Sequence, residues 1–390
     1  MKSRFEKIQN GIFLLMAFHL ALPNIFPYLY FTMTKKNLKG LNLNELQAFV
    51  EELGEKKYRA VQLYSWLYAK AAQSFDEMTD ISKDFRAVLS QISYISNLQL
   101  VTQSVSTDST TKYLFKLNDD LAIESVLIPT TKKSSEEEKR LTLCVSTQVG
   151  CPLDCKFCAT GTMGFTRNLT AGEIVDQVIQ VQRSSQKRIT NLVYMGMGEP
   201  MLNYDNVMKS IDIINDDRGL NIGARHITIS TAGYADKIRQ LADEERPVKL
   251  ALSLHSLDNE KRTKLMPVTK KFPVEELIKA LEYYYHKTRR RPTFEYILFE
   301  GFNDTAADIK LFVKLSRRIP CKINLIPFHS IAFMHPSGIG ASLKPTPAPR
   351  IEAFADTLRK SDITVMVRGS SGQDINAACG QLAVVESKTK

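Results

Sequence analysis

Residues 149–158 read Val149-Gly-Cys151-Pro-Leu-Asp-Cys155-Lys-Phe-Cys158, which places three cysteines close together with no fourth metal ligand beside them. Clustered thiolates bind zinc or an iron–sulfur cluster rather than hard cations such as magnesium. A structural zinc is closed by four protein ligands, whereas a cluster with three protein ligands leaves one iron open to a small molecule. Because zinc ribbons are built mostly from CxxC pairs, the CxxxCxxC spacing indicates a [4Fe-4S] cluster on Cys151, Cys155 and Cys158.

The open iron position distinguishes two classes of protein. A cluster of this kind can bind S-adenosylmethionine (SAM), and one electron from it then splits the sulfonium and makes a primary carbon radical. The alternative is a zinc site completed by a distant Cys or His, in a zinc-stabilised RNA-binding protein without catalysis. A brown anaerobic preparation, as opposed to a colourless one, would separate the two.

From Leu141 onward, short apolar runs alternate with segments of helical periodicity. Such alternation indicates a parallel sheet, either doubly wound or curved into an α/β barrel, and six main units favour a partial barrel. We therefore predict an α/β fold, a partial (β/α)6 TIM-like barrel with a small N-terminal α+β accessory domain. The expected strands are 141–147, 190–196, 226–231, 249–255, 293–299, 322–328 and 363–367, and the expected helices are 171–184, 205–215, 235–244, 258–265, 274–287, 305–318 and 347–360. Thr170 and Glu173 form a capping-box pattern at the start of the first of these helices.

The region before the barrel divides into two parts. Apolar residues recur at helical spacing from Asn42 to about Ser93, which predicts three short helices. Residues 98–130 change to alternating, β-branched runs, which predict two or three antiparallel strands. We expect a helical accessory domain at 33–97, a β-rich connector at 98–140 ending in a charged surface loop, the barrel at 141–382 and a tail at 383–390.

The first residues resemble a signal peptide or a short membrane anchor, because basic residues precede an apolar stretch from Gly11 to about Met33. Polar residues and prolines interrupt that stretch, and no small-x-small cleavage site follows it. An oxygen-sensitive cluster would also be misplaced outside the cell. We therefore expect residues 1–32 to be a non-native extension, the protein to start at Met33, and its location to be cytoplasmic, without a membrane anchor.

The composition is that of a basic globular protein. Its 390 residues are 44% hydrophobic and 24% charged, which excludes disorder as the main feature. Lys and Arg number 52 against 42 Asp and Glu, and this net charge of +10 favours a polyanionic partner such as nucleic acid. Six cysteines, half of them in one motif, are not the pattern of a secreted disulfide scaffold, which again favours a reducing cytoplasm.

Polar residues gather where the predicted strands end, and in parallel α/β folds this edge carries the active groups. The strand 190–196 runs into Met195-Gly-Met-Gly198-Glu199-Pro200. There the glycines allow close approach of a ligand, and Glu199 offers a carboxylate to the amino group of SAM. Taken singly, small polar residues at such ends are more often turn or cap residues. Later strands bring such groups to the same edge at Ser230, Ser253, His255 and Asn324.

Two further cysteines and one glutamate have no evident role from the residues alone. Cys144 lies on the strand that leads to the cysteine motif, and Cys379 lies in a segment whose neighbouring glycines predict a loop. On spacing alone, both are expected to be inert buried thiols. Glu124, in Ile123-Glu-Ser-Val, is expected to be a surface carboxylate of a strand.

Taken together, these motifs resemble the RlmN family of dual-specificity 23S rRNA and tRNA adenine methyltransferases, within the radical SAM superfamily. The resemblance covers the chain from about Leu43 to Leu382, and it implies a barrel of the radical SAM type with an accessory domain that binds RNA. It is carried by Phe75-Asp-Glu-Met-Thr, Leu143-Cys-Val-Ser-Thr-Gln-Val-Gly-Cys151, Gly164-Phe-Thr-Arg-Asn-Leu-Thr-Ala-Gly-Glu173, Met195-Gly-Met-Gly-Glu-Pro200, Ser253-Leu-His255 and Ala377-Ala-Cys-Gly-Gln381.

The resemblance implies methylation of carbon 2 of an adenine, in the peptidyl transferase centre of 23S rRNA and beside the anticodon in tRNA. One SAM methylates Cys379, and a second gives a 5′-deoxyadenosyl radical that activates the methyl group. Glu124 corresponds to the family's proton acceptor, and Cys144 frees the product by attacking Cys379 as a disulfide bond forms. We also expect an electron donor such as flavodoxin or ferredoxin, and a monomer. The family's SAM-contacting positions correspond to Gly198, Glu199, Ser230, Ser253, Leu254, His255 and Asn324.

The nearest alternative is a Cfr-type enzyme, which methylates carbon 8 of the same ribosomal adenine. Pro200, Glu124 and the long N-terminal domain favour carbon 2. The chain departs from the family pattern at Ser371 and Asn376, where the family often has Arg and Asp. These departures leave RNA contacts and loop details open.

Overall fold

The computed structural model describes residues 35–129, 140–369 and 371–384. The expected extension 1–32 and start at Met33 lie outside the described residues, as do most of the charged loop and the last six residues of the predicted tail. No helix within the described ranges is both long enough and apolar enough to cross a bilayer.

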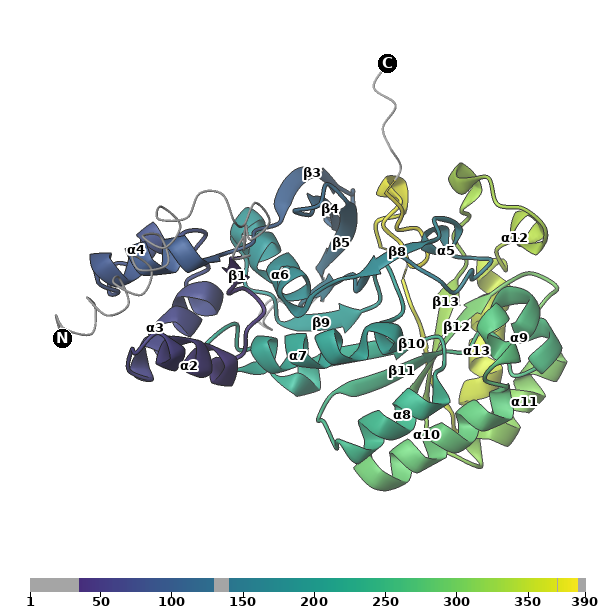
Figure 1. The fold of residues 1–390 in the computed structure, drawn as a ribbon. Coiled ribbons are helices and arrows are strands. Elements are labelled where there is room, and N and C mark those ends of the chain that lie inside the picture. The colour runs from purple at the N-terminus through teal and green to yellow at the C-terminus, as the bar shows by residue number, and fades with distance from the viewer. Residues whose placement is uncertain (1–34, 130–139, 370, 385–390) are drawn as a thin grey trace, which may run out of the picture.

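A single ten-stranded sheet runs through the molecule, in the spatial order β14-β13-β12-β11-β10-β9-β6-β5-β4-β3 (Figure 1). Its parallel strands follow one another in chain order, which is the order of a barrel, whereas a doubly wound sheet reverses at a switch point. The barrel is open, because among the described residues β14 pairs only with β13, while β6 continues into β5. The predicted partial barrel is therefore confirmed. The parallel strands are β6 (Leu141–Cys144), β9 (Asn191–Tyr194), β10 (Ile227–Thr231), β11 (Lys249–Ser253), β12 (Thr293–Leu298), β13 (Lys322–Pro327) and β14 (Thr364–Val367).

Helices cover the outer face of these strands. All residues of β6 are buried, as expected for strands enclosed on both faces, whose sequences are continuous apolar runs. The predicted capping box is present, since Thr170 Oγ1 accepts from Glu173 N (3.2 Å) and Glu173 Oε2 accepts from Thr170 N (2.8 Å). The barrel helices are α6 (Ala171–Ser185), α7 (Tyr204–Asn215), α8 (Ala235–Asp243), α9 (Asn259–Leu265), α10 (Val274–Thr288), α11 (Ala306–Ser316) and α13 (Ala348–Arg359).

Three antiparallel strands extend the barrel sheet beyond β6. They are β3 (Gln99–Val105), β4 (Thr111–Lys116) and β5 (Ala122–Pro129), so the segment expected to be a β-rich connector continues the same sheet. Val126 pairs with Cys144, and Glu124 is two residues from Val126. Because side chains alternate along a strand, all three lie on one face of the sheet.

The N-terminal helices dock against α6. They are α2 (Leu43–Glu52), α3 (Tyr58–Tyr64), which ends in a π-helical turn at 65–69, and α4 (Lys83–Ile92), and they are joined by a short parallel pair, β1 (Lys36–Asn37) and β2 (Ser93–Tyr94), that was not predicted. Lys39 Nζ lies 2.7 Å from Asp176 Oδ1 on α6, with both side chains buried. Gly40 has a φ of +97°, and a Cβ there would lie 2.6 Å from Gly172 N, so only glycine fits this contact.

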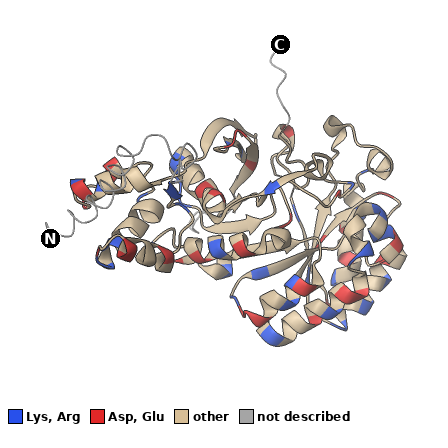
Figure 2. Ribbon diagram, viewed as in Figure 1, with Lys and Arg blue, Asp and Glu red and all other residues tan. Residues whose placement is uncertain are grey.

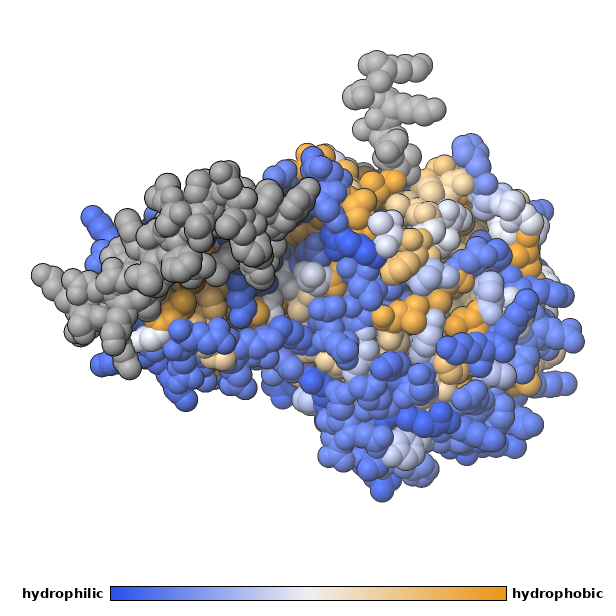
Figure 3. All heavy atoms as spheres, viewed as in Figure 1, coloured by the Kyte–Doolittle hydropathy of each residue, from blue (hydrophilic) through white to orange (hydrophobic). Residues whose placement is uncertain are grey.

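The surface over the outer helices differs from the surface near the C-terminal segment (Figures 2 and 3). Charges of both signs are interspersed along the outer helices such as α8 and α10 (Figure 2). In the view of Figure 3 that region is almost entirely hydrophilic, whereas hydrophobic atoms gather around the C-terminal segment and β8 (Phe165–Asn168). Phe165 itself is 47% exposed.

Other short elements are β7 (Gln148–Gly150), which pairs with β8, α5 (Ala159–Thr162) and α12 (Ile339–Ser342).

Candidate active site

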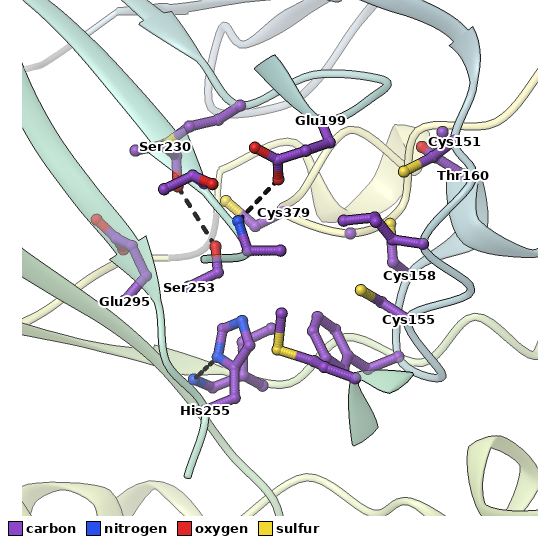
Figure 4. Close-up of a pocket in the computed structure, with 18 of the residues that line it drawn as sticks. Cys151, Cys155, Cys158, Thr160, Glu199, Ser230, Ser253, His255, Glu295 and Cys379 are labelled. Carbon is purple, nitrogen blue, oxygen red and sulfur yellow. Dashed lines mark hydrogen bonds between the residues drawn. The ribbon is translucent and has the colours of Figure 1, made fainter. Parts of the chain in front are cut away.

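A cavity of about 810 Å³, including its open mouth, lies at the carboxyl ends of the parallel strands. Figure 4 shows the three motif cysteines along one wall, with Ser230, Ser253 and Glu199 across from them. The predicted site residues that line it are Cys151, Cys155, Cys158, Gly198, Glu199, Ser230, Ser253, His255 and Cys379.

The cysteine loop is held by backbone contacts. Cys151 N donates to Gly164 O (2.7 Å), which joins β7 to the start of β8, and a Cβ on Gly150 (φ +73°) would collide with the same carbonyl. Burial raises the pKa of Cys151 to about 12 and also raises that of Cys158. A bound metal would provide the positive charge that makes thiolates stable here.

The donor set fits a cluster better than a single zinc ion. Within the described residues, no three Cys, His, Asp or Glu side chains converge closely enough to hold one metal ion. A zinc ion about 2.3 Å from each sulfur would need sulfurs about 4 Å apart. An iron–sulfur cluster takes each thiolate on a different iron, which suits three thiols spread along a cavity wall.

Glu199 is a buried carboxylate that forms no salt bridge with a described Lys or Arg. Its Oε1 accepts from Met201 N (3.0 Å) and its Oε2 from Ala232 N (2.7 Å), and burial raises its pKa. Since a carboxylate has about four acceptor sites, part of its capacity stays free at the cavity. A cationic group such as the ammonium of SAM could bind to the free acceptor positions of this carboxylate.

The glycines of the Gly-Met-Gly-Glu motif were expected to allow close approach of a ligand. In the structure they instead allow close packing of the chain. A Cβ on Gly196 would lie 2.7 Å from Val145 O, and one on Gly198 would lie 2.5 Å from Gln148 Cβ. Both missing side chains therefore face the β6–β7 segment. The glycines let this strand end pack closely on the neighbouring chain, while the backbone of the motif lines the cavity.

His255 is fixed against the cysteine loop. Its ring packs edge-on against Phe157, with centroids 4.6 Å apart, and its Nδ1 accepts from Ile297 N (3.0 Å). Burial, followed by the nearby Arg262 charge, lowers its pKa to about 3, so the ring is neutral with its proton on Nε2. The residue has a φ of +54°, which explains why β11 ends earlier than predicted.

Cys379 joins this cavity to a second one of about 580 Å³, which Cys144 also lines. Gly380 O accepts from Ala159 N (2.7 Å), so the Cys379 loop is tied to the residue after the cysteine motif. Both Cys144 and Cys379 are free thiols. Burial and then the neighbouring Cys379 charge raise the pKa of Cys144 to about 12, against the opposing effects of a backbone hydrogen bond at Met195 and of Arg368.

The expectation that both thiols are buried is wrong for Cys379, which is exposed. The expectation that Glu124 is a surface carboxylate is also wrong, because only 4% of it is exposed. On one face of β5, Ser125 Oγ donates to Gln177 Oε1 of α6 (2.8 Å). On the other face the C-terminal segment covers Glu124, whose Oε2 accepts from Ala383 N (3.0 Å). A contact with a residue far along the chain therefore buries Glu124, which the local sequence pattern predicted to be exposed.

Four of the predicted site residues do not line the main cavity. Leu254 is fully buried, and Asn324 donates from Nδ2 to Glu295 Oε1 (2.8 Å), a residue that does line it. Cys144 lines the second cavity, and Glu124 lines a third with Lys112.

Profiles of known families match both parts of the chain. One described as the ribosomal RNA large subunit methyltransferase N-terminal domain matches residues 36–95, and one for the radical SAM superfamily matches 145–313. A Christiangramia forsetii protein named "Probable dual-specificity RNA methyltransferase RlmN" is 44% identical over 353 residues, covering 90% of this chain and 96% of that protein. A protein of the same name from Caldanaerobacter subterraneus subsp. tengcongensis is 47% identical over 347 residues, covering 89% and 97%. The chain belongs to the RlmN family.

A solved structure agrees with RlmN membership. The crystal structure of a radical SAM methyltransferase from Sphaerobacter thermophilus matches with a TM-score of 0.81 and 40% identity, over 89% of this chain and 99% of that one. The radical SAM type of barrel predicted for the RlmN family is thereby confirmed.

Three charged residues of this RlmN-family site were missed by the sequence analysis. Glu295 and Arg368 line the main cavity, and Arg368 Nη1 lies 3.4 Å from Glu295 Oε2. Arg262 is fully buried and donates to the carbonyls of Ala232, Leu254 and Ser253, where two strands end. A charged residue within an apolar strand, as at Phe294-Glu295-Tyr296, was the available signal for Glu295.

Proposed function

We propose that this protein is a radical SAM enzyme that methylates carbon 2 of an adenine in the peptidyl transferase centre of 23S rRNA and of the adenine beside the anticodon in tRNA. The observation that carries the proposal is the position of Cys379. Its thiol lies between the cavity of the three motif cysteines and a second cavity that holds Cys144. This is the arrangement required when a methyl group is stored on the protein before it is transferred.

The target explains why simple displacement is insufficient. Carbon 2 of adenine is electron-poor and carries a hydrogen, so it does not attack a sulfonium. Cys151, Cys155 and Cys158 would hold the [4Fe-4S] cluster, and Glu199 would bind the SAM ammonium. Cluster and SAM together would supply the carbon-centred radical that activates the methyl group on Cys379.

The chain's own residues would then complete the transfer. Once the Cys379 methylene is bonded to carbon 2, the ring gives up one proton to Glu124 and one electron to an iron–sulfur or flavin one-electron carrier. The Cys144 thiolate attacks Sγ of Cys379, so that an S–S bond forms and the C–S bond breaks. The electron pair of that bond goes to the carbon, which takes a proton and becomes the methyl group of the product.

We also propose which molecules this enzyme binds. The N-terminal helices would bind RNA, in line with the description of the profile they match and with the net charge of +10. A flavodoxin or ferredoxin would reduce the cluster, and the enzyme would act in the cytoplasm as a monomer. Pro200 and Glu124 favour carbon 2 over the carbon 8 of a Cfr-type enzyme.

Two variants test the roles of the thiols. Cys379→Ala should abolish methyl transfer to RNA, while a reduced cluster still cleaves SAM. Cys144→Ala should trap a covalent protein–RNA adduct, because nothing resolves the bond to Cys379. Methyl transfer by the first variant, or clean product release by the second, would contradict the assigned roles.

The site of methylation is tested on the product. Mass spectrometry of RNA digests distinguishes 2-methyladenosine from 8-methyladenosine, and an 8-methyl product would favour the Cfr-type alternative. Broad visible absorption of an anaerobic preparation supports a cluster, whereas a colourless protein with bound zinc would favour a non-catalytic RNA-binding protein.

A further inference from the structure

The third cavity is lined by an ion pair between a half-buried lysine and a buried glutamate. Lys112 Nζ on β4 lies 3.0 Å from Glu124 Oε1 on β5, and their side chains are 17% and 6% exposed. The other carboxylate oxygen accepts from Ala383 N (3.0 Å). Lys112 is therefore the charged group that faces Glu124. The remaining residues that line this cavity are uncharged, namely Leu114, Phe333, Asn376, Gln381, Ala383 and Val384.

Lys112 also contacts the loop that carries Cys379. Its Nζ lies 3.4 Å from the carbonyl oxygen of Asn376, three residues before the thiol. Asn376 has a φ of +50°, a conformation that Asn tolerates better than most residues. The same ammonium thus reaches the carboxylate on the sheet and the backbone of the loop above it.

The sheet register places Lys112 in one row with Cys144. Lys112 pairs with Val126 across β4 and β5, and Val126 pairs with Cys144 across β5 and β6. Neighbouring strands are about 4.8 Å apart, so this row spans about 10 Å between the α-carbons of its ends. Lys112 therefore contacts the carboxylate and the loop of Cys379, and it lies on the same face of the sheet as Cys144, two strands away.

We propose that Lys112 is a positioning residue for the methyl-transfer step, which keeps Glu124 ionised and aimed at the reacting ring while it ties that carboxylate to the Cys379 loop. This inference rests on the proposed function, and specifically on Glu124 as the proton acceptor. When the ring proton moves to Glu124, the carboxylate becomes a neutral carboxyl, the C–H electron pair stays with the ring, and the Lys112 ammonium keeps its protons.

The electrostatics of the pair explain why an ammonium is needed here. Burial raises the pKa of Glu124, and Lys112 is the largest opposing effect. An opposite charge at this separation lowers a carboxyl pKa by about one to three units. Without Lys112, Glu124 would be a carboxylic acid over a wider pH range, and a carboxylic acid cannot accept the ring proton.

The test uses full-length enzyme with its cluster and with Cys379 already methylated. Single-turnover methylation is followed with RNA that carries deuterium at carbon 2 of the target adenine, in parallel with unlabelled RNA. Lys112→Met should slow product formation by about tenfold or more and should produce or enlarge a primary isotope effect, because proton removal becomes limiting. The acid limb of its pH–rate profile should move up by about one to three units. Lys112→Arg should restore most of the rate.

Controls separate this role from a structural one. Lys116→Met, on the same strand but in an exposed pair with Asp120, should leave rate and isotope effect unchanged. Mass spectrometry should find Cys379 methylated to the same extent in Lys112→Met as in the parent. Reduced methylation of Cys379, or a slow rate without an isotope effect, would mean that Lys112 only maintains the fold, and would overturn the proposal.

Failure of this inference is distinguishable from failure of the proposed function. Transfer by Cys379→Ala would remove the proposed function, whatever Lys112 does. If Cys379→Ala is inactive while Lys112→Met keeps the parental rate and isotope effect, the proposed function stands and the role of Lys112 falls. Full product formation by Glu124→Gln would show that another group accepts the proton, and would overturn the role of Lys112 as well.

Discussion

Two lysine–carboxylate pairs with a buried carboxylate lie near the start of the barrel, and their remaining hydrogen-bonding groups are occupied to different extents. In the pair Lys39–Asp176, the carboxylate also accepts from Leu98 N (2.6 Å) and Gln180 Nε2 (3.1 Å), and the ammonium also donates to Asn97 Oδ1 (2.7 Å). In the pair Lys112–Glu124, the other oxygen of the carboxylate accepts one backbone N–H, and the pair borders a cavity.

The difference indicates that Lys39–Asp176 stabilises the fold, whereas Glu124 of the second pair can still take part in proton transfer. Buried charges are costly unless their hydrogen-bonding capacity is filled, and Lys39–Asp176 fills it while joining the N-terminal helices to α6. Lys112–Glu124 keeps capacity open beside a cavity that a substrate ring could approach. A fully satisfied pair stabilises a contact, whereas a partly satisfied one can still accept a proton.

The largest expected effect is on the first pair. Lys39→Met leaves Asp176 buried without a cation, and removal of one partner of such a pair costs about 3–5 kcal/mol. Urea denaturation followed by circular dichroism should show this loss in the free energy of unfolding. The double variant with Asp176→Leu should recover most of it, because an apolar pair replaces the ionic one. A loss below about 1 kcal/mol would contradict the distinction between the pairs.

The second pair should contribute less to stability. Lys112→Met should lower the free energy of unfolding at neutral pH by about 1.4 kcal/mol for each unit by which it raises the pKa of Glu124. The loss is limited because Glu124 can take up a proton or be hydrated from the cavity. Urea denaturation at several pH values, with Lys116→Met as an exposed control, measures this loss. A loss as large as that of Lys39→Met would remove the distinction.

The pH dependence of this loss has a definite sign. The pKa of Glu124 is raised in the folded protein, and without Lys112 it would rise further. Between the unfolded pKa of about 4.3 and the raised folded value, the native state binds more protons than the unfolded state, so stability falls as pH rises. The loss in Lys112→Met should therefore be small near pH 4 and largest above the folded pKa. A loss independent of pH would contradict this account of the pair.

The smallest expected effect concerns the loop above the second pair. Asp374 accepts from Ser106 Oγ (2.5 Å) and Thr107 N (3.1 Å), which fastens the Cys379 loop to the β3–β4 turn. Asp374→Asn should speed amide hydrogen exchange in residues 371–384 while global unfolding stays unchanged. The Ser106 hydrogen bond lowers the pKa of Asp374, so this attachment should persist at neutral pH and weaken as pH falls through the lowered value. Unchanged exchange in the variant would show that other contacts hold the loop.

The parts of the fold with local signals were predictable. The barrel strands are continuous apolar runs, and each predicted strand is present, although several end early. Helix α6 was located by Thr170 and Glu173, and its capping box is formed. The strand ends were predicted too long because the chain turns there toward the cavity, as at His255. Periodicity does not detect such turns.

The candidate site was predictable only where it depends on neighbours in sequence. The motif cysteines and Glu199 line one cavity, as the strand-end argument requires. Burial of Glu124 depends on Ala383, far along the chain, and the pairing of Glu124 with Lys112 depends on strand register. Neither dependence leaves a local pattern. The extension of the barrel by β3–β5 was missed for the same reason, because strand signals alone do not specify the partner of β5.

The unequal burial of the cysteines determines how the folded protein reacts with thiol reagents. Burial raises the pKa of Cys144 to about 12 and that of Cys321 to about 11, so neither thiol reacts readily with a reagent from solution, whereas Cys379 is exposed. Among these three, iodoacetamide should alkylate Cys379 first. An S-methylated Cys379 has no thiol to alkylate. Under the proposed function, the unlabelled fraction at this position, measured after reduction of disulfides, would therefore report what fraction of the molecules carries a methyl group ready for transfer.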